Sequence, residues 1–422
     1  MRKVERVNGI APGRGLRAFH CVLGKYSLHK EQRKGVKMMA LRQKISYLLK
    51  HNEVAQKAYR VVFNTAFRCL GLFVKTDPEL VMFISLMGSR YNDSPRAMYE
   101  YMQAHEEYKK YKCLWAFEDP SKYPEIASIK IDTPKYFLML LKAGYWVSNT
   151  NIQRGLSFKK KKTKWIYTCH GTAIKLCGND CPGRHDFDYS KVNVICVQSK
   201  FDEKVMKSGF KAKEESFLEI GRPCSDPLFS VTDADTIAMK QKLGLPDKKK
   251  VILYAPTWRD SNDGGASYVI KPPIDFKMWE RELGKDFIIL FRAHHITTKV
   301  LNVEFNDFVR DASDYPEIND LMIASDILIS DYSAVLTDYA ILNRPILCFA
   351  YDYDDYLKER GTYFELDDEL PNKSCRTESE LIERIRTLDY EKESRNTERF
   401  RKKFIEFGGN AGEQAVKALF SK

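Results

Sequence analysis

The sequence predicts an α/β protein with two Rossmann-like domains that face each other, preceded by a basic helical segment. Three observations support this. Short apolar runs alternate with helical patterns between residues 79 and 228, and the same alternation returns after residue 248. This alternation is typical of parallel sheets covered by helices on both faces. The third observation is a concentration of Lys and Arg before residue 76.

A chain of 422 residues is long enough for two or three domains. We expect four segments in the chain. They are a basic amphipathic segment (1–78), a first Rossmann-like domain (79–228), a second one (229–390) and C-terminal helices (391–422).

The net positive charge is confined to the N-terminal segment. Residues 1–75 hold 17 Lys and Arg against three acids, which leaves 52 basic and 54 acidic side chains in residues 76–422. A nucleic-acid groove would need basic residues across the folded body, so we expect no nucleic-acid partner. The helical pattern at 40–74 mixes apolar residues with Lys and Arg, as in helices that lie on anionic membranes. Packing of these helices on the protein body is the alternative.

The first domain is expected to begin with a buried strand at 81–85 and a helix from Pro95 to Met102, with Pro at its first position. Further strands are expected at 113–117, 145–149, 164–171 and 193–199, with helices at 134–144 and after 199.

The second domain is expected to use strands at 251–255, 287–294, 326–330 and 345–351. Charged residues at helical spacing from 376 onward predict terminal helices that cross back over the cleft between the domains.

The stretch 323–351 combines a strand, a polar turn, a helix and a second strand. The turn Ser330-Asp331-Tyr332-Ser333 follows the strand directly, and the helix pattern runs through Asp338. A helix N-terminus offers free backbone N–H groups, so a phosphate could rest on Ser333 and the amides after it. An ordinary Ser N-cap is the alternative.

Other strand ends carry polar groups that could share one cleft, because ligands of open α/β sheets bind beyond the carboxyl ends of the strands. His170 follows an apolar strand and precedes Gly171 and Thr172, where a neutral imidazole could act as a general base. A hydrogen-bonded structural histidine is the alternative. Lys175 could offset developing negative charge.

Two strand ends of the second domain carry candidate phosphate ligands. Arg292 and His294 lie on the same side of an extended chain and would suit a pyrophosphate; ordinary polarity at the edge of a strand is the alternative. Thr257 and Arg259 could bind phosphate oxygens, or Arg259 and Asp260 could form a surface ion pair of little energetic value.

Several functional classes lack support in the sequence. The motifs GxxxxGK[ST], GxGxxG and HExxH are absent. The N-terminus lacks an apolar signal region, so the ten cysteines are expected to be reduced thiols. A minor alternative is a metal site formed by Cys169, Cys177, Cys181 and His185, although no CxxC pair is present. No apolar stretch approaches a membrane span, so we expect a soluble or peripheral protein.

Taken together, these motifs resemble the CDP-glycerol glycerophosphotransferase family of teichoic acid primases and polymerases. The matching motifs are CHGTAIKLCGND (169–180), GRPCSDPLF (221–229), ILYAPTWRD (252–260), the strand end from Arg292 to His294, and SDILISDYSAVLTDYAILNRPILCFAYDYDDYLKERGTYFE (325–365). The resemblance covers about residues 80 to 390.

The resemblance implies a glycosyltransferase-B-type fold, with an acceptor domain at 79–228 and a CDP-glycerol-binding domain at 229–390. It implies transfer of glycerol phosphate from CDP-glycerol to a lipid-linked or polymeric acceptor, with release of CMP, on the cytoplasmic face of the cell membrane. The product would be a teichoic acid or a capsular polymer. Alternatives are a CDP-ribitol-type transferase and a non-catalytic binder of anionic lipid or nucleic acid.

The family's motifs also imply roles for residues of this chain. His170 would be the catalytic base, and His294 is the second candidate catalytic residue. Expected substrate-binding residues are Gly171, Thr172, Lys175, Thr257, Arg259, Asp260, Arg292, Asp331, Ser333 and Asp338. Positioning and charge stabilisation suffice for phosphoryl transfer, so no cofactor or protein-bound metal is expected, with Mg²⁺ as an open alternative.

Three positions depart from the family pattern. Cys169 stands where Trp is common and Ile174 where Pro is usual, so the acceptor side is expected to differ in shape. Ala334 replaces the second Ser of the usual DYSS sequence, which removes one hydroxyl from the donor side.

Overall fold

The computed structural model describes residues 52–182, 184–257, 259, 269–270, 273–293, 299–300 and 303–421. The chain divides into two units after Phe67. Helix α2 (Glu53–Phe73) runs across this division and confirms the later part of the helical pattern at 40–74. The earlier part of that pattern lies outside the described residues.

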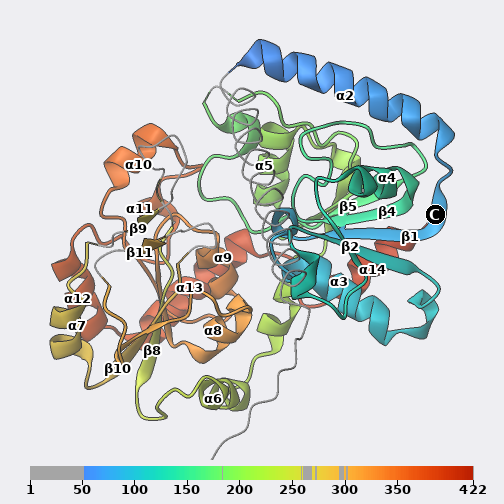
Figure 1. The fold of residues 1–422 in the computed structure, drawn as a ribbon. Helices are drawn as coiled ribbons and strands as arrows, with labels where there is room; N and C mark the ends of the chain where they lie inside the picture. The colour runs from blue at the N-terminus through green and yellow to red at the C-terminus, as the bar shows by residue number, and fades with distance from the viewer. Residues whose placement is uncertain are drawn as a thin grey trace, which may run out of the picture. The chain divides into compact units, whose positions relative to one another are not determined.

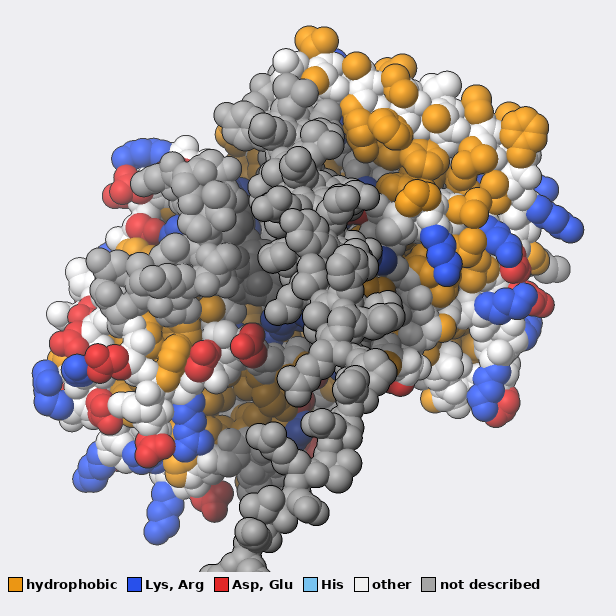
Figure 2. Space-filling model, viewed as in Figure 1, with side chains coloured by type: hydrophobic (Ala, Val, Ile, Leu, Met, Phe, Trp, Pro, Cys, Tyr) orange, Lys and Arg blue, Asp and Glu red, His pale blue; other side chains and the backbone are white. Residues whose placement is uncertain are grey.

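Figure 2 shows apolar side chains gathered along α2, and Leu72 and Phe73 in its last turn are exposed. Within the described ranges, none of the helices combines the length and apolar character needed to cross a membrane.

The unit from Arg68 onward contains a seven-stranded parallel sheet with the order β3-β2-β1-β4-β5-β6-β7. Its strands are β1 (Asp77–Ile84), β2 (Lys112–Phe117), β3 (Ser128–Lys130), β4 (Ala143–Ser148), β5 (Lys164–Tyr167), β6 (Val194–Val197) and β7 (Phe217–Glu219). The predicted strands at 81–85, 113–117, 145–149, 164–171 and 193–199 all have counterparts, whereas β3 and β7 were not predicted because each has only three residues.

Side chains of this sheet alternate between two covered faces, as the strand geometry requires. Val81 and Phe83 pack with α3 (Asp93–Ala104) and α14 (Ala411–Phe420) in one core cluster. Helix α4 (Pro134–Lys142) covers the other face, where Trp146 donates its indole N–H to the Leu140 carbonyl. Figure 1 shows α3 and α14 below the sheet and α4 above it.

A second parallel sheet has the order β12-β10-β8-β13-β14. Its strands are β8 (Lys250–Tyr254), β10 (Phe287–Phe291), β12 (Val309–Asp311), β13 (Ile327–Ser330) and β14 (Ile346–Cys348). A separate two-stranded sheet pairs β9 (Val269–Ile270) with β11 (Lys299–Val300). The four strands predicted for this half are present, and β12, β9 and β11 were not predicted.

Helices also cover both faces of the second sheet. One core cluster joins the strands to α7 (Phe276–Leu283) and α12 (Glu378–Arg386). The other joins them to α8 (Ile318–Ala324), α9 (Val335–Ala340) and α13 (Tyr390–Phe404). Helix α13 contacts α9 of this half and α5 (Lys200–Phe210) of the first half, whereas α14 contacts elements of the first half.

The remaining helices lie between these elements: α6 (Asp233–Lys242), α10 (Tyr353–Glu359) and α11 (Leu366–Glu369), with short 3-10 turns at Leu86–Gly88, Glu106–Tyr108, Pro120–Lys122, Gly178–Asp180, Glu214–Ser216 and Pro223–Ser230.

Several element boundaries differ from the prediction. The helix predicted to start at Pro95 begins at Asp93, so Pro95 is its third residue; the first helical turn tolerates proline because its N–H groups need no intrahelical partner. The strand predicted at 164–171 ends at Tyr167, since Cys169 (φ 54°) and Gly171 (φ 131°) leave the extended conformation. His170 therefore lies in the loop after β5.

Candidate active site

A cavity of about 500 Å³ lies at the carboxyl ends of strands from both sheets. Met87 and Thr150 line it after β1 and β4, and Thr257 and Ser333 line it after β8 and β13. In each sheet these are the neighbouring strands at which the strand order reverses, the usual ligand position in such folds. The cavity brings together seven of the predicted site residues: His170, Gly171, Thr172, Lys175, Thr257, Ser333 and Asp338.

The loop after β5 approaches the turn after β13 closely. A Cβ atom built on Gly171 would lie 2.5 Å from the Cβ of Ala334. The φ of Gly171 is +131°, a conformation that other residues rarely adopt. Both the positive φ and the short distance to Ala334 therefore require glycine at position 171. A residue larger than Ala at position 334 would collide with this loop.

His170 has one ring nitrogen fixed by the backbone. Its Nδ1 lies 2.9 Å from the Asn149 carbonyl oxygen, which can only accept a hydrogen bond. The proton is therefore on Nδ1, and Nε2 carries the lone pair. The side chain is exposed to the cavity, and desolvation by the protein around the ring lowers the pKa of His170 despite the opposing effect of Asp93. The imidazole is thus kept neutral and able to accept a proton.

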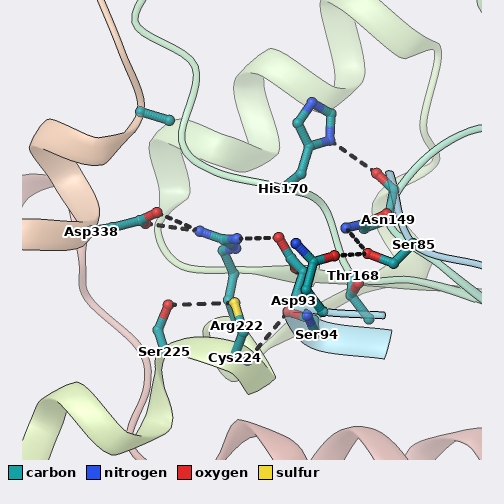
Figure 3. A network of polar contacts seen from close by, with 12 residues as sticks. Ser85, Asp93, Ser94, Asn149, Thr168, His170, Arg222, Cys224, Ser225 and Asp338 are labelled. Carbon is teal, nitrogen blue, oxygen red and sulfur yellow. Dashed lines mark hydrogen bonds and ion pairs between the residues drawn. The ribbon is translucent and has the colours of Figure 1, made fainter. Parts of the chain in front are cut away.

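Asn149, which positions His170, is itself held by two side-chain hydrogen bonds. Its side-chain oxygen accepts from the Leu86 backbone N–H at 2.8 Å, and its amide donates to the Ser85 hydroxyl at 3.2 Å. Ser85 in turn donates to the Asn92 side chain at 2.9 Å. The carbonyl that selects the His170 tautomer is therefore fixed by the loops after β1 and β4 (Figure 3).

A buried ion-pair network lies beside His170. Arg222 is 4% exposed and donates from Nη1 to both carboxylate oxygens of Asp338 at 2.8 Å. Its Nη2 donates to Asp93 at 3.2 Å. Figure 3 shows the Arg222 side chain between these two carboxylates, with the His170 ring pointing away from them. Arg222 comes from the loop after β7, whereas Asp338 lies on α9, so the network joins the two halves of the site.

The two carboxylates of this network have opposite pKa shifts. Burial raises the pKa of Asp338, and the nearby Arg222 only partly offsets this. Burial also acts on Asp93, but the Arg222 charge, the Ser94 N–H and His170 together bring the pKa of Asp93 below its usual value. Asp93 is therefore the more firmly ionised partner.

The predicted ligands Asp331 and Arg259 are both engaged within the protein. Asp331 accepts from the backbone N–H groups of Thr257 and Tyr332 at 2.9 and 2.8 Å and from Arg259 at 2.9 Å. Arg259 also binds Asp352 through two contacts of 2.5 and 3.0 Å. Arg259 thus pairs with Asp331 and Asp352, and its predicted neighbour Asp260 lies outside the described residues.

Thr257 and Ser333 offer hydroxyl groups to the cavity. The Thr257 Oγ1 is buried and has no hydrogen-bond partner among the described residues. Ser333 Oγ accepts from the Val335 N–H at 3.3 Å, the first residue of α9. The helix N-cap is Ala334, which has no side-chain cap, so the alternative interpretation of Ser333 as the N-cap is wrong: Ser333 lies one position before the cap.

The other predicted ligands have varied surroundings. Thr172 is buried and accepts from the Gln198 amide at 3.1 Å, and Lys175 forms an isolated β-bridge with Thr362. Arg292 lies outside the cavity lining and donates to the Ala312 and Tyr315 carbonyls at 3.1 and 2.7 Å. His294 lies outside the described residues.

Sequence reasoning did not assign four residues of this region: Asp93, Asn149, Asp202 and Arg222. Arg222 lies inside the matched motif at 221–229, and its neighbours Gly221 and Pro223 resembled ordinary turn signals. Asp202 lines the cavity, and burial raises its pKa to about 6. Its position at the third residue of a helix resembles an ordinary capping residue.

The cysteines near the site do not form a metal centre. Among the described residues, which include Cys169, Cys177, Cys181 and His185, no three His, Cys, Asp or Glu side chains converge as metal ligands. Cys181 donates to the Leu176 carbonyl at 3.2 Å, and Cys177 lies 3.5 Å from the Tyr363 hydroxyl.

Comparisons with known proteins agree with this architecture. A family model described as CDP-Glycerol:Poly(glycerophosphate) glycerophosphotransferase matches residues 66–421. A teichoic acid poly(glycerol phosphate) polymerase of Staphylococcus epidermidis is 33% identical over 394 residues, which are 84% of this chain and 54% of that protein. The chain thus spans about half the length of this relative.

Two further matches bear on the donor and on the fold. A teichoic acid poly(ribitol-phosphate) polymerase of Bacillus spizizenii is 33% identical over 216 residues, 50% of this chain and 34% of that protein. The solved structure of the wall teichoic acid polymerase TagF is similar with a TM-score of 0.72 and 28% identity, and the match covers 93% of this chain and 97% of that one.

Proposed function

Because the chain belongs to the CDP-glycerol:poly(glycerophosphate) glycerophosphotransferase family, we propose that it transfers glycerol phosphate from CDP-glycerol to an acceptor hydroxyl and releases CMP. The acceptor is a lipid-linked or polymeric glycerol phosphate chain in teichoic acid synthesis. The observation that carries the proposal is His170, whose protonated Nδ1 faces a backbone carbonyl while Nε2 remains available in the cavity.

The proposed reaction uses His170 as the base. Nε2 takes the proton of the acceptor hydroxyl while the oxygen of that hydroxyl forms a bond to the glycerol-bearing phosphorus of CDP-glycerol. The bond from this phosphorus to the bridging oxygen breaks, and CMP leaves with the electron pair. A neutral imidazole suits this step, and the burial that lowers the pKa of His170 keeps it neutral at physiological pH.

We assign the donor phosphates to the side of the cavity formed after β8 and β13. Thr257 Oγ1 supports this assignment, because a buried hydroxyl without a partner costs about 1–3 kcal/mol unless it is paired. Ser333 lies on the same side, and Lys175 approaches from the first half. His294 and Asp260 stay candidate donor ligands outside the described residues.

The two sheets are proposed to belong to facing domains, 79–228 for the acceptor and 229–390 for the donor, as in the glycosyltransferase-B type. The cavity lined from both sheets supports this division. The enzyme would act at the cytoplasmic face of the membrane, where the 17 Lys and Arg of residues 1–75 would meet anionic lipid. Deleting these residues should move the protein from the membrane to the soluble fraction, and unchanged partitioning would contradict the proposal.

CMP release from CDP-glycerol with a lipid-linked glycerol phosphate primer tests the function. His170→Gln should lower kcat by about 10²–10⁴-fold, the usual contribution of a general base, while donor binding stays unchanged. His105→Gln is the matched control, because His105 Nδ1 lies 2.8 Å from the Tyr101 carbonyl outside the cavity. Full activity of His170→Gln would exclude this residue as the base.

A CDP-ribitol donor is the second candidate, supported by the partial match to a ribitol-phosphate polymerase. Competition between the two donors decides between them. We expect CDP-glycerol to have the higher kcat/KM, because the glycerol-phosphate relative matches 84% of this chain.

A further inference from the structure

A second cavity, of about 560 Å³, lies at the opposite edge of the seven-stranded sheet from His170. Its lining residues directly precede three strands: 159–161 before β5, 190–193 before β6 and 213–216 before β7. These residues lie at the N-terminal ends of the strands. Because the strands are parallel, the three ends lie at the same edge of the sheet. The cavity is therefore distinct from the candidate active site, which follows the C-terminal ends.

This lysine cavity concentrates positive charge on an otherwise balanced body. Among the described residues, its lining has one carboxylate, that of Glu215, and five lysines: Lys159, Lys160, Lys161, Lys191 and Lys213. Residues 76–422 as a whole hold 52 basic and 54 acidic side chains. Only Lys213 reaches Glu215, at 3.5 Å and with both side chains exposed. Among the described residues no salt bridge joins Lys159, Lys161 or Lys191 to a carboxylate, although the charge of Asp188 acts on Lys191 from outside the lining.

The positions of several of these ammonium groups are set by the fold. Lys160 donates to the Val74 and Leu141 carbonyls at 2.6 and 3.0 Å, and Lys191 donates to the Ser157 hydroxyl at 2.9 Å. Lys159 is half-buried, and burial together with the Lys191 charge lowers the pKa of Lys159 to about 8. Like charges are thus held near one another, and a bound anion would relieve their repulsion.

The lining also indicates the chemical class of the anion. None of the described residues that line it is aromatic, so they offer no surface on which a nucleobase could stack. Val192 is its single aliphatic hydrophobic residue, whereas insertion into a lipid layer requires an apolar face. Lysine side chains, with Ser190 and Asn193 between them, suit the charged oxygens of a phosphodiester without a base.

We propose that the lysine cavity is a second anion site, which binds phosphodiester groups of the poly(glycerol phosphate) acceptor away from its reacting hydroxyl. The proposal rests on the function given above, in which the acceptor carries one negative charge per unit. Such a site would hold a long acceptor more tightly than a short one without taking part in the chemistry.

The test compares the double variant Lys159→Gln/Lys191→Gln with the wild-type protein. The control is Lys135→Gln/Lys142→Gln, which removes two exposed charges of α4 outside the cavity. The probe is a water-soluble glycerol phosphate hexamer, whose Kd is measured by calorimetry. We expect the Kd of the first variant to rise at least 10-fold and that of the control less than 2-fold. Steady-state CMP release should show a higher KM for long acceptors, with kcat and the KM for CDP-glycerol unchanged.

The outcomes separate the alternatives. Equal hexamer binding by the wild type and Lys159→Gln/Lys191→Gln would overturn the proposal, as would no hexamer binding by the wild type. If that variant loses binding to phosphatidylglycerol vesicles and retains hexamer binding, the site is a lipid headgroup site and the polymer assignment is wrong. Lysine-dependent hexamer binding without CMP release by the wild type would leave the site standing and refute the proposed function.

Discussion

Replacing Arg222 by Met should destabilise the protein strongly. Arg222 is the cation between the buried carboxylates of Asp93 and Asp338, with contacts of 2.8 Å to Asp338 and 3.2 Å to Asp93. Methionine has a similar length and no charge, so the two carboxylates would remain buried without their partner. Breaking a buried pair from one side costs about 3–5 kcal/mol. We expect a cost at the lower end of this range, because the pKa of Asp338 is already raised by burial. In the variant, protonation of Asp338 would remove one of the two unpaired charges.

Urea unfolding followed by circular dichroism measures this loss. Lys402→Met is the control, because Lys402 forms an exposed pair with Glu398 at 2.7 Å and such pairs contribute about 0–1 kcal/mol. The triple variant Arg222→Met/Asp93→Asn/Asp338→Asn removes all three charges and should regain part of the loss. A cost below about 1 kcal/mol for Arg222→Met would refute the reasoning, as would a triple variant no more stable than the single one.

Three further predictions concern the same site. Gly171→Ala should cost more stability than Gly155→Ala, because both glycines have positive φ but only Gly171 meets Ala334, and Gly171→Ala/Ala334→Gly should recover part of the difference in thermal unfolding. Thr257→Val should not lower the stability of the donor-free protein, because it removes a buried hydroxyl that has no partner among the described residues, and it should weaken CDP-glycerol binding severalfold in calorimetry; unchanged affinity would count against a donor contact. Between pH 7 and pH 5, His170→Gln should lose less free energy of unfolding than the wild type in urea titrations. The pKa of His170 is lower in the folded protein than in the unfolded chain, so the wild type loses stability as the pH falls through the unfolded pKa of this histidine. Equal losses in the two proteins would contradict the lowered pKa.

The sequence was sufficient to predict the parallel α/β architecture and the neighbourhood of His170. Apolar runs of four to eight residues are local signals, and all of the strands they predicted have counterparts in the structure. The carboxyl ends of such strands meet at one edge of a sheet, so polar residues directly after them could be assigned to a common cavity. His170, Thr257 and Ser333, which come from three different strand ends, do line one cavity.

The pairing of charges was decided only by the tertiary structure. Arg222 and Asp338 are 116 residues apart, and Arg259 pairs with Asp331 and Asp352, which lie 72 and 93 residues further along the chain. The lysine cavity likewise combines three loops that precede different strands, in a body whose overall charge is nearly balanced. Strand and helix periodicity reports burial along one segment, whereas the energy of a buried charge depends on which distant segment supplies its partner.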